Sequence, residues 1–362
     1  VGSEMCIRDS ISTDKDKIRV KDYSAISVMS GLKSLYLNSD IIKDIGFIKG
    51  LPALEDLTLE DTAVISLASL SEMPALRSLT LLGNNKVQDF GPVGTATGLT
   101  SLSIDKMTSQ PDPDLSSLSG LVKLDIKGFM SISSVRGLSG LKELSIHNCN
   151  VDQADALSSL TGVERLTFYS VWNSQGNLRN LDFLKGMTGL KYADFTGNLD
   201  GTGWSGYNYL VEVYGDVSSI FNHQGLEELY LDNGKFEINF DKIKENPGLR
   251  VLSLRNMELH KNYYVESYGG MTSVWYDDVK LGEHMDILSR FPNLEELYLD
   301  SNELTDLNFA AGLKNLKRLG LKDNYITDLS PLKQAEFLEY LDIRDNPVGE
   351  VGDVGNGVEI LQ

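Results

Sequence analysis

The residue types that most often carry chemistry are few in this chain of 362 residues. There are four histidines and two cysteines, at His147, His223, His260, His284, Cys6 and Cys149. Their spacing fits neither a zinc site nor a disulfide scaffold, and no G-x-S-x-G nucleophile motif occurs. The sequence therefore predicts no catalytic residue, no metal site and no cofactor, in a protein that is not an enzyme.

Two short patterns resemble functional motifs but lack the context that those motifs need. The run Gly201-x-Gly203-x-x-Gly206 matches the G-x-G-x-x-G of dinucleotide-binding loops, yet no predicted strand leads directly into it. His147 projects from a predicted strand near Asp125, as a general base with its orienting carboxylate would, but the pattern places no nucleophile beside it. We interpret the glycines as a flexible loop and His147 as a solvated side chain.

The composition narrows the classes of partner. Apolar residues make up 41% and charged residues 23%, which is typical of a chain that folds around a core. The 33 basic and 52 acidic residues give a net charge of −19, which would repel a phosphate backbone. No apolar run approaches the roughly 18 residues that a spanning helix needs. We therefore expect no nucleic-acid partner and no membrane span in this sequence.

Hydrophobic residues in the pattern L-x-x-L-x-L must position whatever site the chain has. Thirteen copies occur, with 22 residues as the commonest interval between them; their first residues are Leu32, Leu54, Leu76, Leu99, Leu121, Leu141, Val163, Leu190, Leu226, Leu249, Leu294, Leu316 and Leu338. Each copy reads as a short strand with one buried face, so that Leu297 and Leu299 point inward while Glu296 and Tyr298 point outward. One unit cannot bury its own apolar face, but stacked neighbours can.

A turn position follows each strand and often holds asparagine. It is occupied by Asn84, Asn198, Asn302, Asn324 and Asn346. A buried asparagine there can bond the backbone of neighbouring turns, whose polar groups cannot reach water. Cys149 takes the same position, and we interpret it as a small buried residue of this ladder rather than a reactive thiol.

The stretch LEELYLDSNELTDLNFAAGLKNLKRLGLKDNYITDLSPL, from Leu294 to Leu332, resembles the leucine-rich repeat family, specifically its short 22-residue, internalin-like bacterial class. The resemblance extends over about Ile18 to Val348. It implies an α/β repeat fold: a curved leucine-rich-repeat solenoid with a parallel β-sheet on the concave side and short helices, 3-10 turns and irregular segments on the convex side. It also implies a recognition role toward protein partners. The chain lacks cysteine-bonded caps and Asn-x-Ser/Thr sequons, which favours a bacterial surface protein or an intracellular one.

We expect three parts along the chain. Residues 1–10 fit nothing downstream and are expected to be a non-native or disordered tail. Residues 11–348 are expected to form a single solenoid of about 13 repeats, and residues 349–362 a truncated C-terminal end. Both ends thus suggest a fragment of a longer protein.

Three inserts interrupt the 22-residue spacing, near residues 172–180, 200–215 and 260–278. They hold all three tryptophans and many tyrosines: Trp172, Trp204, Tyr207, Tyr209, Tyr263, Tyr264, Tyr268, Trp275 and Tyr276. Long loops on a rigid scaffold are where binding residues concentrate, and Tyr and Trp give large contact area. These aromatics could pack on one another, anchor a protein partner, or stack on a sugar. Truncating Trp204 and Trp275 to Ala without loss of partner affinity would eliminate the anchor hypothesis.

A second candidate surface is the outward side of the later strands. Its tyrosines are Tyr169, Tyr192, Tyr230, Tyr298 and Tyr340, with acidic residues between them. This face favours a basic partner, although strand propensity alone could place aromatics there. Together the two surfaces predict that the chain recognises a protein partner and is not catalytic. We expect it to be the exposed, extracellular ligand-binding domain of a bacterial surface or secreted protein, and to be monomeric. The alternatives are an intracellular, cytoplasmic scaffold or regulatory subunit and a glycan-binding surface.

Overall fold

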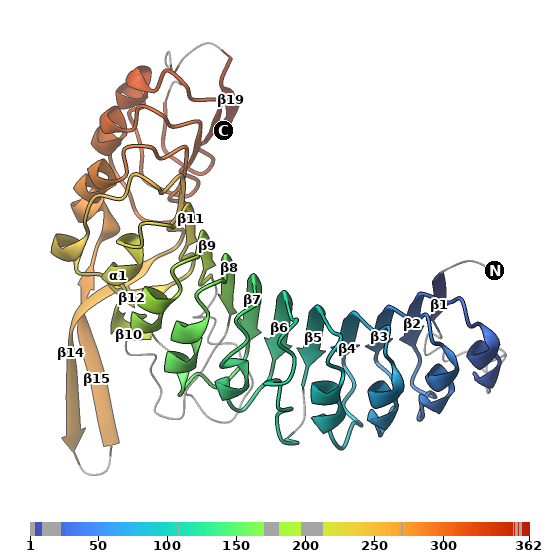
Figure 1. Cartoon of the computed structure of the whole chain (residues 1–362). Helices are drawn as coiled ribbons and strands as arrows, with labels where there is room; N and C mark the ends of the chain where they lie inside the picture. Colours follow the sequence, from blue (N-terminus) through green and yellow to red (C-terminus); the bar gives the residue numbers. More distant parts are fainter. Residues whose placement is uncertain are drawn as a thin grey trace, which may run out of the picture. The chain divides into compact units, whose positions relative to one another are not determined.

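The computed structural model describes residues 4–8, 23–106, 109–169, 181–196, 213–268, 271–349, 351, 354 and 357–362. Within these ranges, side chains are described except at 4–8, 213–215, 235, 262–268 and 271–276. Contacts between residues divide the chain into two compact units, residues 1–163 (unit 1) and 164–362 (unit 2). Figure 1 shows both units, with many of their strands labelled.

Unit 1 is a stack of coils, each of which contributes one strand to a parallel sheet. Its strands are β1 (Glu4–Arg8), β2 (Ser34–Asn38), β3 (Asp56–Glu60), β4 (Ser78–Leu82), β5 (Ser101–Asp105), β6 (Lys123–Lys127) and β7 (Glu143–His147). They pair in chain order, and Leu35 lies opposite Leu57, which lies opposite Leu79. The apolar positions of successive coils therefore stack on one another, as the repeat spacing requires.

Strand β1 lies within residues 1–10, where we expected a non-native or disordered tail. It pairs in parallel with β2, with Glu4 opposite Ser34 and Arg8 opposite Asn38. For these five residues the backbone thus differs from that expectation and continues the sheet of unit 1.

Short 3-10 helices return the chain on the side of unit 1 away from the sheet (Figure 1). They are η1 (Ser24–Val28), η2 (Gly46–Gly50), η3 (Ala68–Glu72), η4 (Gly91–Thr95), η5 (Ser133–Val135) and η6 (Ala154–Ser159). Each buries one or two residues, such as Ile48 in η2 and Val93 in η4. A 22-residue coil leaves room for only about one such turn between strands, which is why long α-helices do not form.

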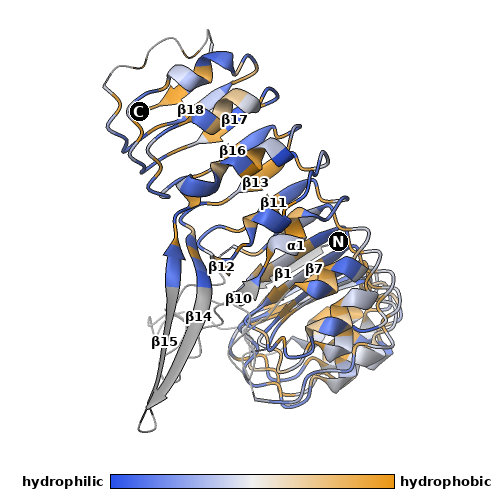
Figure 2. Ribbon diagram, turned by 90° about the vertical axis from the view of Figure 1, so that its left-hand side faces the viewer, coloured by the Kyte–Doolittle hydropathy of each residue, from blue (hydrophilic) through white to orange (hydrophobic). Residues whose placement is uncertain are grey.

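Unit 2 repeats the same design, with strands that are shorter except for the first. They are β8 (Arg165–Tyr169), β9 (Tyr192–Asp194), β11 (Glu228–Tyr230), β13 (Val251–Ser253), β16 (Glu296–Tyr298), β17 (Arg318–Gly320), β18 (Tyr340–Asp342) and β19 (Glu359–Leu361), parallel in that order. The returning segments are η7 (Asp182–Gly186), α1 (Ser218–Phe221), η8 (Phe240–Lys242), η9 (Leu281–Arg290), η10 (Asn308–Gly312) and η11 (Ser330–Gln334). Figure 2 shows apolar residues running along the interior of this stack. The predicted fold class, a leucine-rich-repeat solenoid with a parallel sheet and short helical returns, is confirmed within each unit.

The predicted strand alternation and asparagine ladder are present. Leu297 and Leu299 are fully buried, and Tyr298 between them is half-buried on the outward side. Asn324 is 3% exposed; its side-chain oxygen accepts the N–H groups of Asn302 and Leu304, each at 3.0 Å. Each ladder asparagine thus joins its own turn to the preceding one. Asn198 lies outside the described residues.

Cys149 takes a ladder position in unit 1, as expected for a small buried residue. Its sulfur accepts the N–H of Phe129 at 3.4 Å and lies 3.2 Å from the carbonyl oxygen of His147. Burial raises the pKa of this thiol to about 12, so it stays protonated and unreactive at neutral pH.

Unit 2 also contains a second, four-stranded sheet. Its strands, in spatial order, are β10 (Val213–Asp216), β12 (Lys235–Glu237), β14 (Glu258–Tyr268) and β15 (Met271–Val279). The insert near 260–278 is therefore a β-hairpin, in which Tyr264 lies opposite Trp275 in an antiparallel pair (Figure 1).

Candidate functional site

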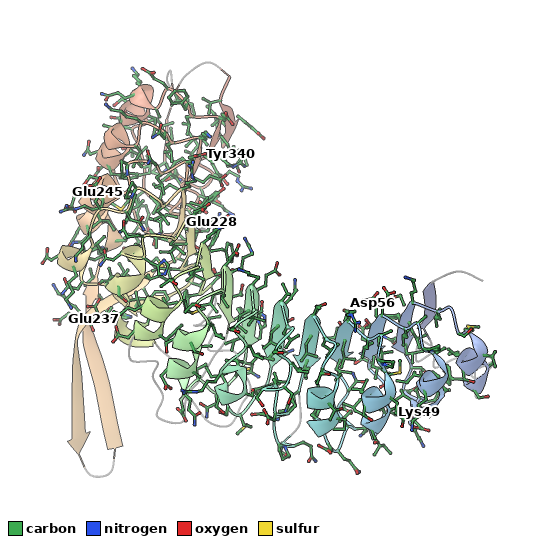
Figure 3. All side chains as sticks on the ribbon, in the orientation of Figure 1. Lys49, Asp56, Glu228, Glu237, Glu245 and Tyr340 are labelled. Atoms are coloured by element: carbon green, nitrogen blue, oxygen red, sulfur yellow. The ribbon has the colours of Figure 1, made fainter. Side chains whose placement is uncertain are left out.

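The outward side of the unit 2 sheet, which we call the open face, gathers the tyrosines that the sequence singled out. Figure 3 shows Glu228 and Tyr340 on this strand side of unit 2 and Glu245 on its opposite side. Strand pairing sets the neighbours: Tyr192 lies opposite Glu228, and Tyr230 lies opposite Asp194. The face is thus a grid of rows that run across the strands.

The first row stands just before the strands and alternates in charge. It consists of Glu164, Lys191, Glu227, Arg250, Glu295, Lys317 and Glu339. Lys317 pairs with Glu295 at 2.6 Å, Arg250 also pairs with Glu295, and Lys191 lies 3.5 Å from Glu164. Hydrogen bonds from Lys317 and Arg250 hold the pKa of Glu295 below its ordinary value. This row therefore neutralises much of its own charge.

Three tyrosine rings on the open face each carry an arginine from a neighbouring coil. The guanidinium carbon of Arg165 lies 3.7 Å from the ring centre of Tyr192. The corresponding distances are 4.3 Å for Arg255 over Tyr298 and 4.4 Å for Arg318 over Tyr340. Cation–π contacts of this kind fix the orientation of both partners and contribute roughly 0.5–1 kcal/mol each at exposed sites.

Two carboxylates beyond the strand ends hold one of these arginines. Arg255 donates to Asp300 at 2.6 Å and to Asp232 at 3.0 Å, and Asp232 also accepts the hydroxyl of Ser253. These two carboxylates raise the pKa of Arg255 further above its ordinary value despite its partial burial. Arg255 is thereby kept over Tyr298.

The tyrosine hydroxyls are hydrogen-bonded to acids on their own strands. Tyr192 donates to Asp194 at 3.2 Å, and Tyr230 donates to Glu228 at 3.2 Å. Tyr298 likewise donates to Glu296, at 2.6 Å. Burial, with the nearby carboxylate second, raises the pKa of Tyr192 to about 12 and raises that of Tyr230 as well. The hydroxyls therefore remain protonated donors at every physiological pH.

The structure brings only some of the predicted site residues together. The rings of Tyr192 and Tyr230 lie 5.4 Å apart at 41°, whereas Tyr169 is exposed at the end of β8. Tyr263, Tyr264 and Tyr268 lie in β14 and Trp275 and Tyr276 in β15, but their side chains are outside the described part of the chain. Trp172, Trp204, Tyr207 and Tyr209 lie outside it altogether.

Arginines are the functional residues that the sequence reasoning missed. Arg318 and Tyr340 occupy the same position in consecutive units, 22 residues apart, as do Arg165 and Tyr192 across an insert. Aligning the units position by position would have shown an arginine preceding each of these two tyrosines. An alignment of the repeats is therefore the sequence signal that could have identified these arginines.

Unit 1 contains two titratable residues that could suggest a functional site, but each has a structural role or a partner within the fold. His147 lies 3.4 Å from Asp125 on the open side of its sheet, as predicted for a solvated histidine. Lys106, fully buried, pairs with Asp112 at 3.2 Å and donates to the carbonyl of Gln110 at 2.6 Å, so it supports a loop. Among the residues that the structure describes, no three His, Cys, Asp or Glu side chains gather as a metal would require.

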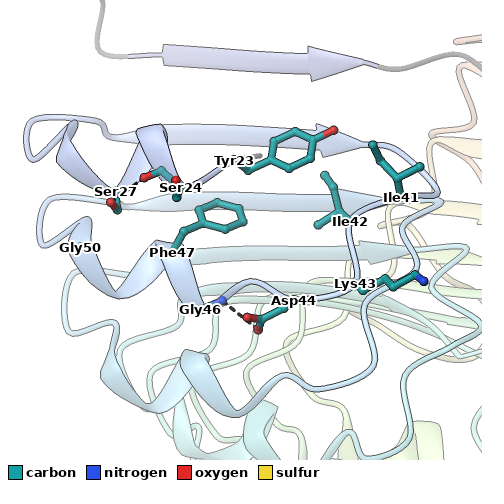
Figure 4. Close-up of a pocket in the computed structure, with 10 residues that line it drawn as sticks. All are labelled: Tyr23, Ser24, Ser27, Ile41, Ile42, Lys43, Asp44, Gly46, Phe47 and Gly50. Atoms are coloured by element: carbon teal, nitrogen blue, oxygen red, sulfur yellow. Dashed lines mark hydrogen bonds between the residues drawn. The ribbon is translucent and has the colours of Figure 1, made fainter. Parts of the chain in front are cut away.

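A cavity of about 550 Å³ lies on unit 1 between η1 and η2 (Figure 4). Its walls include the rings of Tyr23 and Phe47, which stack with their centres 6.2 Å apart. Its carboxylate, Asp44, accepts the backbone N–H of Gly46 at 3.0 Å and so serves the turn. The cavity gathers no set of converging polar side chains comparable to the open face of unit 2.

Comparisons with known proteins agree with this architecture. A family profile described as "Leucine Rich repeats (2 copies)" matches residues 292–334. An internalin from Listeria monocytogenes is 19% identical, with a TM-score of 0.64 over 93% of this chain and 85% of the internalin. A leucine-rich-repeat protein of Leptospira interrogans is 17% identical, with a TM-score of 0.58 over 92% and 91% of the two chains.

A chain in the Toll–Spätzle complex of Drosophila is 17% identical, with a TM-score of 0.62 over 87% of this chain and 40% of that one. No curated protein sequence matches this chain. At these identities the solved structures show a shared fold. Together with the repeat pattern and the profile match, they show that the chain has the leucine-rich-repeat fold.

Proposed function

We propose that the chain is a non-catalytic protein-recognition module whose contact surface is the open face of unit 2. The observation that supports this most directly is the set of three Arg–Tyr stacks, because half-buried tyrosines held by arginines form a surface that is already ordered. A preformed surface loses little side-chain entropy on binding. Tyr and Arg are also the residue types that most often dominate binding energy at protein interfaces.

We propose further that the module acts at the surface of a bacterium or after secretion. The similarity in fold to an internalin and to a Leptospira leucine-rich-repeat protein supports this location. Among the described residues, no helix is both long enough and apolar enough to cross a membrane. Sequencing the complete reading frame tests the location: an export signal or wall anchor is the expected result, and a cytoplasmic fusion partner would contradict it.

A blocking experiment tests the contact surface. Val251 stands at the centre of the open face, opposite both Glu228 and Glu296. In a Cys6→Ser background, Val251→Cys is labelled with a bulky maleimide, because Cys149 is buried and unreactive. A displayed library of extended peptides, selected against the unlabelled protein, provides the probe.

We expect the label at position 251 to weaken the selected peptides at least about tenfold, since it covers the central strand. The matched control is the same label on Lys244→Cys, at an exposed position beside Glu245 on the opposite side of unit 2 (Figure 3). It should change affinity less than about twofold. Peptides that bind equally well to both labelled proteins would eliminate the open face as the contact surface.

A further inference from the structure

The carboxylates of the open face differ in how far the chain itself neutralises them. In the first row, Glu164 pairs with Lys191 and Glu295 with Lys317. Towards the other end of the strands, Asp232 and Asp300 pair with Arg255, and Asp342 pairs with Arg344. Glu296 accepts the hydroxyl of Tyr298 and lies opposite Arg318 of the next strand, whose charge offsets it. Among the acids that lie within the strands of the open face, Asp194 of β9 and Glu228 of β11 therefore remain without a basic partner in the described part of the chain.

Asp194 and Glu228 form no ion pair with a basic side chain in the part of the chain that the structure describes. Asp194 accepts the hydroxyl of Tyr192 and, at 2.8 Å, the backbone N–H of Thr196. Glu228 accepts the hydroxyl of Tyr230. Each carboxylate is half-buried and retains acceptor capacity after these bonds, since an ionised carboxylate can accept about four. Two negative charges thus lie on adjacent strands without an ion-pair partner among the described residues.

Tyr230 differs from the other strand tyrosines in the same respect. Tyr192, Tyr298 and Tyr340 each carry a guanidinium over the ring. Strand pairing places Asp194 on one side of Tyr230 and the small Ser253 on the other. Among described residues, no arginine or lysine lies over its ring. The Arg–Tyr arrangement found at these three tyrosines is therefore not completed at Tyr230 by the described residues.

We propose that a basic side chain of the protein partner, arginine above all, completes this arrangement. Its site, the Tyr230 subsite, consists of Tyr230, Tyr192, Glu228 and Asp194. The guanidinium lies over the ring of Tyr230 and donates to the carboxylates of Glu228 and Asp194. This inference rests on the proposed function and specifies the partner chemistry that the open face selects.

Arginine fits the Tyr230 subsite better than lysine does for two physical reasons. A planar guanidinium stacks on an aromatic ring while its edge still donates to carboxylates, and it loses less hydration energy than an ammonium group. The chain demonstrates the same geometry itself, because Arg255 lies over Tyr298 while it donates to Asp232 and Asp300. An uncharged side chain would leave the two acids unneutralised.

The test uses protein labelled with ring-¹³C tyrosine and three pentapeptides, Gly-Ser-X-Ser-Gly with blocked ends. X is arginine, lysine or citrulline, which has the shape of arginine without its charge. The NMR signals of Tyr192, Tyr230, Tyr298 and Tyr340 are assigned by single Tyr→Phe substitutions. We expect the arginine peptide to shift the Tyr230 signal saturably, the lysine peptide to bind about threefold more weakly, and the citrulline peptide to leave the signal in place.

Substitutions inside and outside the Tyr230 subsite show which side chains bind the arginine peptide. Glu228→Gln should weaken the arginine peptide about fivefold, because it removes a charge that the chain does not neutralise. Glu296→Gln, the equivalent change beneath Tyr298, should weaken it less than about twofold, since Arg318 offsets that acid. Tyr230→Phe keeps the aromatic ring and should retain the affinity for the arginine peptide. Tyr230→Leu removes the ring and should lower that affinity about fivefold. Thermal melting of each variant verifies folding, and Asp194→Asn replaces Glu228→Gln should the latter fail to fold.

The inference is overturned if the citrulline peptide shifts the Tyr230 signal as strongly as the arginine peptide does. It is overturned equally if Glu296→Gln weakens binding as much as Glu228→Gln. The blocking experiment at Val251 separates this outcome from failure of the proposed function. Library peptides that the Val251 label blocks, but that bind without a basic residue, would leave the contact surface standing and remove only the Tyr230 subsite.

Discussion

At the scale of single residues, the asparagine ladder carries polar groups that the packed core cannot otherwise satisfy. Asn324 accepts two backbone N–H groups and donates to the carbonyls of Leu299 and Leu321 at 3.0 and 2.8 Å. We predict that Asn324→Ala lowers the free energy of unfolding by about 2–4 kcal/mol, because it leaves two buried N–H groups without partners. Urea denaturation followed by circular dichroism measures the change. The exposed Asn315→Ala, which loses a bond to the carbonyl of Pro292, should cost less than about 1 kcal/mol.

A second residue-scale prediction concerns acid. Two hydrogen bonds from the Arg344 guanidinium, at 2.9 and 2.6 Å, hold the pKa of Asp342 below its ordinary value of 3.8. The pair therefore stabilises the fold above pH 3.8, and this contribution is lost as the pH falls through the depressed folded-state pKa. We expect Asp342→Asn to melt at a lower temperature than the parent at pH 7, with the gap closing at lower pH. A gap that stayed constant from pH 7 to about pH 2 would contradict this assignment.

At the scale of elements, the β14–β15 hairpin divides into a base that joins the body of unit 2 and a longer part that pairs with itself. Phe236 of β12 lies opposite Leu259 of β14, and Leu259 is 3% exposed. From Lys261 onward, the described backbone of β14 pairs with β15. We predict that replacing residues 262–276 with Asn-Gly changes the melting temperature by less than about 3 °C, whereas Leu259→Ala destabilises by about 2–4 kcal/mol. Equal losses in the two variants would show that the hairpin supports the core along its whole length.

How far the sequence predicts the elements depends on whether their interactions are local. The strands and their buried face follow from leucines spaced 22 residues apart, because each coil contacts the next in a fixed register. The hairpin was expected only as an insert, although Gly269-Gly270 between aromatic and β-branched residues is a recognised hairpin signal. The Arg–Tyr stacks were missed because each joins two coils, and an insert separates Arg165 from Tyr192. The sequence identified the tyrosines one by one. Which charged residues surround each tyrosine depends on how neighbouring strands pair, and this pairing was not considered.

At the scale of the whole molecule, the net charge of −19 acts over a longer range than any contact. It raises the rate at which a basic partner meets the protein, while contacts at the Tyr230 subsite set how long the complex lasts. We predict that the association rate constant of an arginine-containing peptide from the library falls about tenfold between roughly 20 and 300 mM salt. Its dissociation rate should change less than about threefold. Stopped-flow fluorescence measures both, and the same peptide with citrulline in place of arginine is the control. An association rate that did not respond to salt would show that the acidic field plays no part in capture, and the choice of a basic partner would then rest on the Tyr230 subsite alone.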